Sequence, residues 1–233
     1  IYEYIIGKKA DTLVFQSTFD KHSFLSRHPL LKHKIIAKTE VIGGNILTPW
    51  FDPAFAKTNT SLRLNTLLFI GSINKRKGVE LLLEAFEVLS SSFPHLSMII
   101  VGFGPDEDKL KDRLSTSPCY DKITFTGRSG NPFSFLKDAD LLVVPSLFDS
   151  YPNVILEAVH SGTPVIAART GGIPEMLEHQ DLLFEPGSVT ALQEKIEVLC
   201  SDNSQFLKVK QLTETLQPKF AFDWVGEFEK LLD

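Results

Sequence analysis

The feature that most constrains this chain is a regular alternation, from residue 66 onward, of short apolar runs with longer segments of helical period. A strand that is apolar along its whole length must be buried on both faces, as happens in a parallel sheet between two layers of helices. The alternation therefore predicts an α/β fold, with a Rossmann-like parallel sheet and helices on both faces. The predicted strands are residues 66–70, 96–101, 122–126, 141–144 and 163–167, with a weaker one at 181–184.

The segments between these strands have the spacing of amphipathic helices. In the first of them, apolar residues recur at intervals of three or four positions and line one face, as a helix packed on a sheet requires. These residues are Val79, Leu82, Leu83, Phe86 and Leu89. Helices are predicted at residues 79–91, 106–115, 132–137, 153–161 and 189–200, followed by a helical tail at 204–216 and 222–232.

Bulk properties exclude several kinds of partner and location. Proteins that bind nucleic acids usually have a basic face, whereas this chain has a formal net charge of -5. We therefore expect no nucleic-acid partner. Cys119 and Cys200 are the only cysteines, too few for a disulfide framework, which predicts a reducing, cytoplasmic compartment. The apolar runs fall short of the roughly 20 residues that a membrane helix needs, so we expect a soluble chain.

The first 45 residues follow a different pattern. A strand at residues 12–17 and a helix at 20–27 are predicted, after an amphipathic helical segment and before a basic, irregular passage at 29–38. Gly, Pro and Asn gather beyond that passage, which predicts a boundary between residues 44 and 65. The chain begins with Ile1 rather than Met, inside a predicted helix, so we expect it to be a fragment of a longer polypeptide.

The polar residues that follow each strand are the candidates for a site, because ligands bind at the carboxyl ends of the strands in an open parallel sheet. After the first strand comes the stretch GSINKRKG, residues 71–78. A glycine turn, three consecutive cations and a helix amino-terminus can together hold phosphate oxygens. A solvated basic turn is the alternative, since the glycine pattern is not of the Walker type. The candidate residues here are Gly71, Ser72, Arg76 and Lys77.

Two weaker candidates follow the next two strands. VGFGPD, residues 101–106, has two glycines that permit close backbone approach, but a simple strand-to-helix turn is the better interpretation. FTGR, residues 125–128, ends a strand with Gly127 and then offers Arg128, whose planar side chain can stack on a base.

The most informative segment is PSLFDSYPNVILEA, in which Asp149 precedes a helix and Glu157 lies about two turns inside it. Two carboxylates so placed can accept hydrogen bonds from separate hydroxyl groups, while the free N–H groups of Asn153 to Ile155 can face a diphosphate. The alternatives are a helix cap for Asp149 and a solvated helix face for Glu157. Because Glu157 sits among apolar neighbours, an acid without a ligand or partner would be costly there, which favours the binding role.

At this point the sequence resembles the large family of retaining glycosyltransferases with the GT-B fold. The stretch DSYPNVILEAVHSGTPVIAARTGGIPEML, residues 149–177, is similar to that family's signature. FIGSINKRKG (69–78), VGFGP (101–105) and ADLLVVPS (139–146) are similar to further elements of the family, in the expected order. The resemblance runs from about residue 66 to the end of the chain, and its motifs are long and specific.

The resemblance implies a domain organisation. Residues 65–233 would form the nucleotide-sugar donor-binding domain, with a carboxy-terminal helical tail. Residues 1–45 would be a remnant of the amino-terminal, acceptor-binding domain with its hinge, and residues 46–64 the interdomain linker. The chain would thus be the carboxy-terminal half of a GT-B fold.

The resemblance also implies a role for each candidate residue. Lys77 would hold the donor's diphosphate, aided by amides of the helix that carries Glu157. Glu157 would bind the ribose hydroxyls, Asp149 a hydroxyl of the transferred sugar, and the backbone beside Gly127 and Arg128 the base. Catalysis would be largely electrostatic, with no metal and with no cofactor other than the nucleotide-sugar co-substrate.

An expected function follows from these implications. The protein would be a hexosyltransferase that uses a UDP-sugar, or less favourably a GDP-sugar, and transfers the sugar with retention to a saccharide, lipid or protein acceptor. The product would be a polysaccharide, lipid-linked saccharide or glycoconjugate. This chain alone would bind the donor but transfer little, and the full-length protein would at most contact a membrane peripherally.

Two departures from the family pattern keep alternatives open. Asp149 stands where relatives usually have Glu, and Ser72 where they often have Arg, for which Arg76 would substitute. These departures favour, as an alternative, a non-catalytic nucleotide-sugar-binding or scaffolding subunit. Another enzyme of the same fold, such as a nucleotide-sugar epimerase, is a second alternative.

Overall fold

The computed structural model describes residues 10–30, 35–44, 61–131 and 133–231, and its largest element is a six-stranded parallel sheet. The strands follow the spatial order β5-β4-β3-β6-β7-β8, so the chain builds outward from β3 in one direction and then in the other. Every neighbouring pair is parallel, as the fully apolar strands predicted. The strands are β3 (Thr66–Ile70), β4 (Ser97–Val101), β5 (Ile123–Gly127), β6 (Leu141–Val144), β7 (Val165–Ala168) and β8 (Leu183–Phe184).

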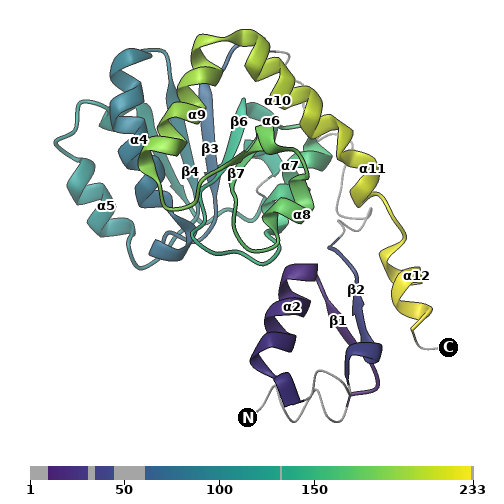
Figure 1. Ribbon diagram of the computed structural model, residues 1–233. Helices are drawn as coiled ribbons and strands as arrows, with labels where there is room; N and C mark the ends of the chain where they lie inside the picture. Colours follow the sequence, from purple (N-terminus) through teal and green to yellow (C-terminus); the bar gives the residue numbers. More distant parts are fainter. Residues whose placement is uncertain (1–9, 31–34, 45–60, 132, 232–233) are drawn as a thin grey trace.

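Helices cover both faces of this sheet (Figure 1), which confirms the predicted fold class. The α-helices are α4 (Val79–Ser92), α5 (Glu107–Leu114), α6 (Phe133–Asp138), α7 (Asn153–Ser161), α8 (Ile173–Leu177), α9 (Val189–Ser201), α10 (Asn203–Thr215), α11 (Gln217–Phe220) and α12 (Trp224–Glu229). The 3-10 turns are η4 (Lys75–Lys77), η5 (Tyr120–Lys122) and η6 (Gln180–Leu182). None of the helices in the described ranges is long and apolar enough to cross a membrane.

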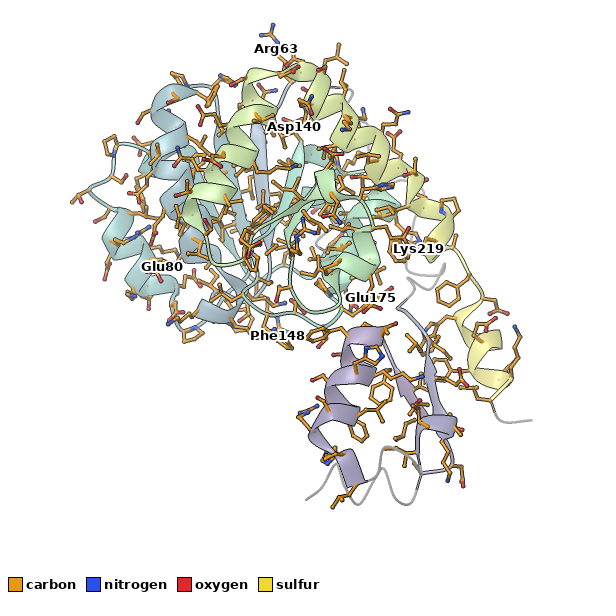
Figure 2. All side chains as sticks on the ribbon, viewed as in Figure 1. Arg63, Glu80, Asp140, Phe148, Glu175 and Lys219 are labelled. Carbon is orange, nitrogen blue, oxygen red and sulfur yellow. The ribbon has the colours of Figure 1, made fainter. Side chains whose placement is uncertain are left out.

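The core lies on both sides of the sheet. Every residue of β6 and β7 is buried, as expected for central parallel strands. At the amino-terminal edge of the sheet the Asp140 carboxylate accepts hydrogen bonds from the backbone N–H groups of Asn65 and Thr66, at 2.9 and 3.0 Å (Figure 2). This carboxylate joins the start of β3 to the start of β6 and satisfies two backbone donors.

The described residues between 10 and 44 form a smaller, two-stranded parallel sheet with one helix. β1 (Leu13–Phe15) pairs with β2 (Thr39–Val41), which follows the 3-10 turn η1 (Ile36–Lys38), and α2 (Thr18–Arg27) contacts both strands. The Ser17 side chain accepts a hydrogen bond from the backbone N–H of Asp20 and so caps α2.

The predictions for this segment have mixed outcomes. The strand at 12–17 and the helix at 20–27 are confirmed, with ends that differ by at most two residues. The strand β2 at residues 39–41 was not predicted, because three residues with a central glutamate carry no periodic signal. Helix α8 was missed for a similar reason, since it has only five residues and follows two glycines. The predicted first helix and residues 46–60 of the predicted linker lie outside the described residues.

The six-stranded sheet and the helices on its two faces are called the large unit below. The amino-terminal segment contacts this large unit at the loops that follow β6 and β7. The rings of Phe19 and Phe148 lie 5.9 Å apart, centre to centre. A side chain on Gly43 would place its Cβ 2.7 Å from the Tyr151 hydroxyl, so the backbone after β2 packs closely on that ring. Figure 2 shows Phe148 and Glu175 at this junction, between the sheet and α2.

Candidate functional site

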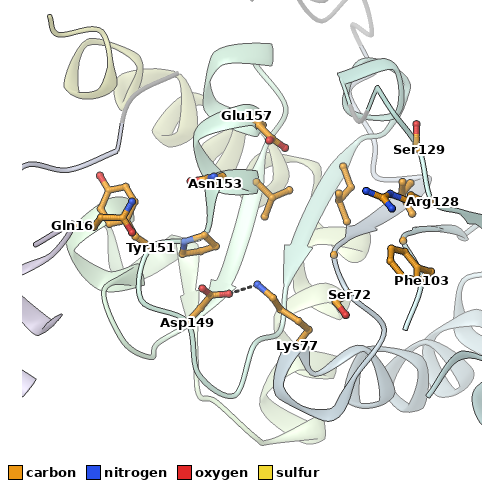
Figure 3. A pocket seen from close by; sticks show the side chains of 16 residues that line it. Gln16, Ser72, Lys77, Phe103, Arg128, Ser129, Asp149, Tyr151, Asn153 and Glu157 are labelled. Carbon is orange, nitrogen blue, oxygen red and sulfur yellow. Dashed lines mark hydrogen bonds and ion pairs between the residues drawn. The ribbon is translucent and has the colours of Figure 1, made fainter. Parts of the chain in front are cut away.

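A cleft of about 580 Å³ opens at the carboxyl ends of β3, β4, β5 and β6 and at the amino end of α7 (Figure 3). This edge of a parallel sheet is the one at which ligands bind. The lining residues are Gln16, Ile70, Gly71, Ser72, Lys77, Val101, Gly102, Phe103, Arg128, Ser129, Asp149, Tyr151, Pro152, Asn153, Val154 and Glu157.

All the residues that the sequence predicted for a site line this cleft, except Arg76 and Gly127. The Arg76 guanidinium donates instead to the backbone carbonyl of Phe148, at 3.1 Å. The Gly127 carbonyl accepts a hydrogen bond from the N–H of Gly102 at 2.8 Å, within the sheet edge. Binding roles for Arg76 and Gly127 stay predictions.

A tight turn positions Lys77 at the cleft. The Asn74 side chain accepts a hydrogen bond from the backbone N–H of Lys77 at 3.1 Å, which shapes the 3-10 turn η4. The next residue, Gly78, has φ +69°, and a Cβ on it would lie 1.9 Å from the carbonyl oxygen of Pro145. Only glycine permits both this left-handed conformation and this contact, which holds the basic turn against the loop after β6.

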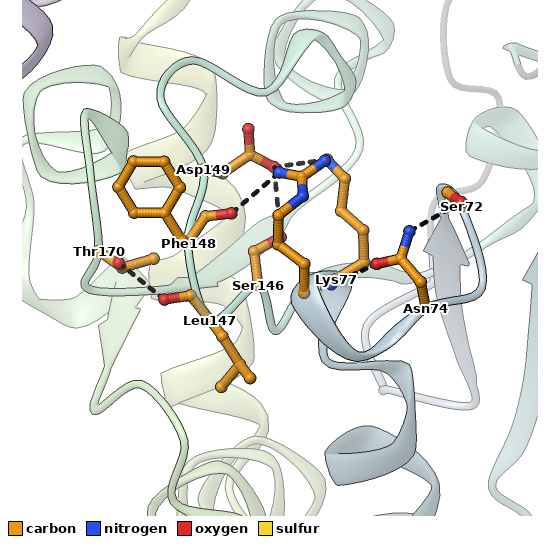
Figure 4. Close-up of polar contacts among 9 residues, drawn as sticks. Ser72, Asn74, Lys77, Ser146, Leu147, Phe148, Asp149 and Thr170 are labelled. Carbon is orange, nitrogen blue, oxygen red and sulfur yellow. Dashed lines mark hydrogen bonds and ion pairs between the residues drawn. The ribbon is translucent and has the colours of Figure 1, made fainter. Parts of the chain in front are cut away.

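The Lys77 ammonium is paired with Asp149 in this structure. Its Nζ donates to Asp149 Oδ2 at 2.5 Å, and the same oxygen accepts from the Ser146 hydroxyl at 3.3 Å (Figure 4). Arg76 approaches the same atom at 4.0 Å. Asp149 is 8% exposed, so a cation and a hydroxyl satisfy a nearly buried carboxylate.

Glycine backbones also hold Asp149 in place. Gly171 has φ +57°, and a Cβ there would lie 1.8 Å from the Asp149 carbonyl oxygen. The N–H of Gly172 donates to that carbonyl at 3.2 Å. The two glycines after β7 therefore let one loop pack on the backbone of the other. No described side chain caps α7, whose N-cap residue is Pro152, so Asp149 does not serve as the helix cap.

The amino end of α7 faces the cleft with its first residues, Asn153 and Val154. The prediction of a free N–H at Ile155 was wrong, because this group donates to the carbonyl of Pro152 at 3.0 Å. The first N–H groups of a helix have no acceptor within the helix, and the helix dipole adds partial positive charge at that end. Together with the Lys77 ammonium, this end of α7 provides donors and positive potential in the middle of the cleft, a combination that suits phosphate oxygens.

Glu157 lies two turns into α7 and is half-buried at the wall of the cleft. Burial raises the pKa of its carboxyl above the ordinary glutamate value. Among the described residues, none donates a hydrogen bond to this carboxylate in the structure. A half-buried acid that lacks a protein donor and faces a cleft is suited to accept hydrogen bonds from hydroxyl groups of a ligand.

Arg128 and Phe103 form the end of the cleft that lies away from Asp149 and Tyr151 (Figure 3). The Arg128 guanidinium lies 5.4 Å from the centre of the Phe103 ring, and Ser129 is beside it (Figure 3). Phe103 is 55% exposed, which is unusual for a large apolar side chain and leaves a ring face for a ligand. The glycine at position 102, with φ +141°, packs against the carbonyl of Gly71 and brings this loop close to β3.

Phe103, Tyr151 and Gln16 are among the lining residues that the sequence alone did not indicate. Phe103 lies in the loop after β4 that was interpreted as a simple turn, and Tyr151 lies inside the quoted signature without a chemical signal of its own. Desolvation by burial, partly offset by a backbone hydrogen bond with Gly44, raises the pKa of Tyr151 to about 12. Gln16 is far away in sequence, so its place in the cleft depends on how the amino-terminal segment packs.

The fold and the cleft define an α/β protein that can hold an anionic, hydroxyl-rich ligand at the carboxyl edge of its sheet. The model of the family described as Glycosyl transferases group 1 matches residues 51–215, and the chain belongs to this family. In the described residues no group of three or more His, Cys, Asp or Glu side chains is placed to hold a metal ion.

Named relatives give the family context. The chain is 26% identical over 177 residues to the 2-deoxystreptamine N-acetyl-D-glucosaminyltransferase of Niallia circulans, which covers 73% of this chain and 46% of that protein. It is 31% identical over 166 residues to the sulfoquinovosyl transferase SQD2 of Arabidopsis thaliana, covering 65% of this chain and 31% of that protein. The chain therefore spans less than half the length of these two relatives.

Solved structures have the same fold. HepE of Anabaena, determined in complex with UDP, superposes with a TM-score of 0.79 at 20% identity and covers 98% of this chain and 64% of that one. TarM superposes with a TM-score of 0.80 at 16% identity, covering 99% of this chain and 45% of that one. These likenesses place the chain in the GT-B fold, as the sequence predicted.

Proposed function

We propose that this chain is the nucleotide-sugar-binding half of a retaining hexosyltransferase whose donor is a UDP-sugar or, as the second choice, a GDP-sugar. The observation that carries the proposal is the order of chemical groups along the cleft. A stacked Arg128 and Phe103 lie at one end, cationic Lys77 in the middle, and polar side chains at the other end (Figure 3). The UDP complex of HepE and the name of the Niallia circulans relative support this assignment.

The proposed donor lies across the sheet edge. Its base would rest near Arg128 and Phe103, and its ribose hydroxyls would donate to the Glu157 carboxylate. The diphosphate oxygens would accept hydrogen bonds from the Lys77 ammonium and from the N–H groups at the start of α7. Asp149, released from Lys77 by the diphosphate, would accept a hydrogen bond from a hydroxyl of the transferred sugar.

The proposed catalysis is electrostatic. As the bond between the sugar and the diphosphate breaks, negative charge grows on the departing nucleoside diphosphate. The Lys77 ammonium and the dipole of α7 are fixed in advance at the place where that charge appears. These groups take the part that a divalent metal takes in other nucleotide sites, so the proposal requires no metal. The acceptor hydroxyl, from a saccharide, lipid or protein, would attack from the same face that the diphosphate leaves, and its proton would pass to the departing phosphate oxygen.

Calorimetric titration of the 233-residue chain with UDP, GDP and ADP tests this proposal. We expect preferential binding of one nucleotide, weakened at least tenfold by Lys77→Ala and by Glu157→Ala, with no divalent metal required. The exposed Lys75→Ala is the matched control and should bind as the wild type does. A nucleotide affinity that neither Lys77→Ala nor Glu157→Ala lowers would contradict the proposed site. We also expect this chain alone to transfer little sugar to an added acceptor.

A second candidate function is a non-catalytic nucleotide-sugar-binding subunit. One observation favours it: the cleft wall at Ser72 offers a hydroxyl rather than a charge, and Arg76 is engaged with the Phe148 carbonyl. Of the two cations Lys77 and Arg76, Lys77 alone would then face the diphosphate, because Arg76 donates to the Phe148 carbonyl. Nucleotide binding without any donor hydrolysis or transfer by the full-length protein would favour this candidate over the transferase.

A further inference from the structure

One residue of the cleft comes from outside the part of the chain that the family model matches. Gln16 lies between β1 and the Ser17 that caps α2, and it lines the cleft with residues of the large unit. In Figure 3 it enters on the side opposite Arg128 and Phe103, toward the end that holds Asp149 and Tyr151. The cleft is therefore built from two segments of the chain.

The start of α2 is held in place by a carboxylate of the large unit. Glu175, on α8, accepts a hydrogen bond from the backbone N–H of Thr18 through Oε2 and from that of Phe19 through Oε1, both at 2.7 Å. Both carboxylate oxygens are thus used on the first N–H groups of α2, which have no acceptor within the helix. An acid at this position also interacts favourably with the helix dipole.

Two further contacts make this junction close and specific. Ser17 is 1% exposed, and a Cβ on Gly172 would lie 2.9 Å from its hydroxyl oxygen, so the loop before α8 packs directly on the cap of α2. On the other side of Glu175, the Lys219 ammonium donates to its backbone carbonyl at 2.5 Å. The position of Gln16 follows from these contacts, because it is the residue directly before Ser17.

The chemistry of a glutamine amide indicates what it would bind. The amide offers two N–H donors and an acceptor oxygen, and carries no charge. Sugar hydroxyl groups are both donors and acceptors, whereas a diphosphate is satisfied better by the Lys77 ammonium. Gln16 lies away from the base end of the cleft, on the side of Asp149, where the transferred sugar of the proposed donor would lie.

We infer that Gln16 is a specificity-determining residue that hydrogen-bonds the transferred sugar, and that Glu175 is a positioning residue that holds Gln16 in the cleft. This inference rests on the proposed function, since it needs a nucleotide sugar in the cleft. It adds a sugar contact from the amino-terminal segment to a donor site otherwise built by the large unit.

The test compares a nucleotide with its sugar conjugate. Dissociation constants for UDP, UDP-glucose and UDP-N-acetylglucosamine are measured by calorimetry for the wild type, Gln16→Ala, Glu175→Ala, Glu175→Gln and the double variant Gln16→Ala/Glu175→Ala. We expect Gln16→Ala to lower the affinity for the preferred UDP-sugar about fivefold relative to UDP, the size of one hydrogen bond. The affinity for UDP alone should stay unchanged, which also shows that the variant is folded.

Glu175→Ala should cause the same selective loss, and the double variant should lose no more than either single variant, because both act through one contact. Glu175→Gln keeps one acceptor oxygen and should recover part of the selectivity. The exposed Gln211→Ala on α10 is the control and should match the wild type. A Glu175→Ala protein that binds UDP normally and keeps full sugar selectivity would overturn the positioning role.

The outcomes separate this inference from the proposed function. If the wild type binds UDP but Gln16→Ala leaves the ratio of UDP-sugar to UDP affinity unchanged for both sugars, this inference alone is wrong. If the wild type binds none of UDP, GDP and ADP, the proposed function is wrong, and the role of Gln16 is wrong with it. If GDP is the nucleotide that binds, GDP and GDP-mannose replace the UDP probes with the same expectations.

Discussion

The two parts of this molecule differ in how they are held together. In the large unit the central strands β6 and β7 have no residue more than 5% exposed, and one continuous core surrounds them. The amino-terminal segment has two three-residue strands and a described core of only Phe24, Leu25 and Ile35. Two-stranded sheets of this size are marginal in isolation. The large unit therefore stabilises itself, whereas the small segment depends on the surface on which it packs.

This difference bears directly on the cleft. The charged groups, Lys77, Asp149 and Glu157, stand on elements fixed by the large core. Gln16 stands on the weakly cored segment, and contacts across the junction position it. Binding of the nucleotide should therefore tolerate changes in the small segment, while selectivity for the sugar should not.

The largest expected effect is on the free energy of unfolding, when a glycine is replaced by alanine in the large unit and in the amino-terminal segment. Gly78→Ala adds a Cβ 1.9 Å from the Pro145 carbonyl at φ +69°, so we expect it to lower the free energy of unfolding by more than about 2 kcal/mol. Gly43→Ala meets only the end of the Tyr151 side chain, at 2.7 Å, and should cost about 1 kcal/mol or less. Urea unfolding measures both. Equal costs would contradict the contrast between the two parts.

The next effect concerns ligand affinity in the large unit. Lys77→Met removes the ammonium that pairs with Asp149 and would bind the diphosphate, so UDP affinity should fall about tenfold or more. Lys75→Met changes an exposed lysine two residues away in the same turn and should leave the affinity within about twofold. Isothermal calorimetry at fixed salt measures both. Comparable losses would mean that general positive charge, not the placed Lys77, binds the nucleotide.

A smaller effect follows from the raised pKa of the Glu157 carboxyl, whose cause is burial. A carboxyl with a raised pKa favours folding below the ordinary glutamate pKa, and this contribution is lost as the pH rises through the raised value. At neutral pH, Glu157→Gln should thus raise the Tm above that of the wild type, and the gain should shrink as the pH falls. The same variant should weaken UDP binding, by about threefold to tenfold.

The control for this pH experiment is Glu194→Gln, an exposed glutamate on α9. It should change neither the pH dependence of the Tm nor the affinity. A Glu157→Gln variant that is less stable than the wild type at neutral pH would show that the carboxylate has a stabilising partner in the free protein, and would contradict a carboxylate left free for a ligand.

The smallest effect is expected at a surface ion pair of the large unit. Lys111 donates to Glu107 one helical turn away on α5, at 2.6 Å, and this hydrogen bond raises the Lys111 pKa. Both ends are partly exposed, so Lys111→Met should change the free energy of unfolding by about 0.5 kcal/mol or less. A larger loss in urea unfolding would mean that the stability of this unit does not come mainly from its core.

Much of the fold could be predicted because each strand and helix of the large unit has a clear pattern of apolar residues within its own short stretch of sequence. Strands such as β6 are apolar along their whole length, and each loop with a candidate residue follows such a strand directly. The gathering of Lys77, Asp149 and Glu157 at one edge follows from parallel topology alone. Short elements escaped prediction, since β2 and α8 have three and five residues and therefore no measurable periodicity.

Contacts between distant residues could not be predicted. Lys77 and Asp149 are 72 positions apart, and nothing in either loop indicates that they pair in the free protein. The bonds from Thr18 and Phe19 to Glu175 span more than 150 positions and depend on how two units pack. Gln16 enters the cleft for that reason only.

A nucleotide site at the carboxyl edge is tested most directly by mapping backbone amide shifts in the ¹⁵N-labelled chain during titration with UDP. We expect the largest shifts at Gly71, Ser72, Asn153 and Val154, with little change at Asn65 on the opposite edge of the sheet. Shifts concentrated around Asn65, or none at any concentration in a folded chain, would contradict a nucleotide site at the carboxyl edge.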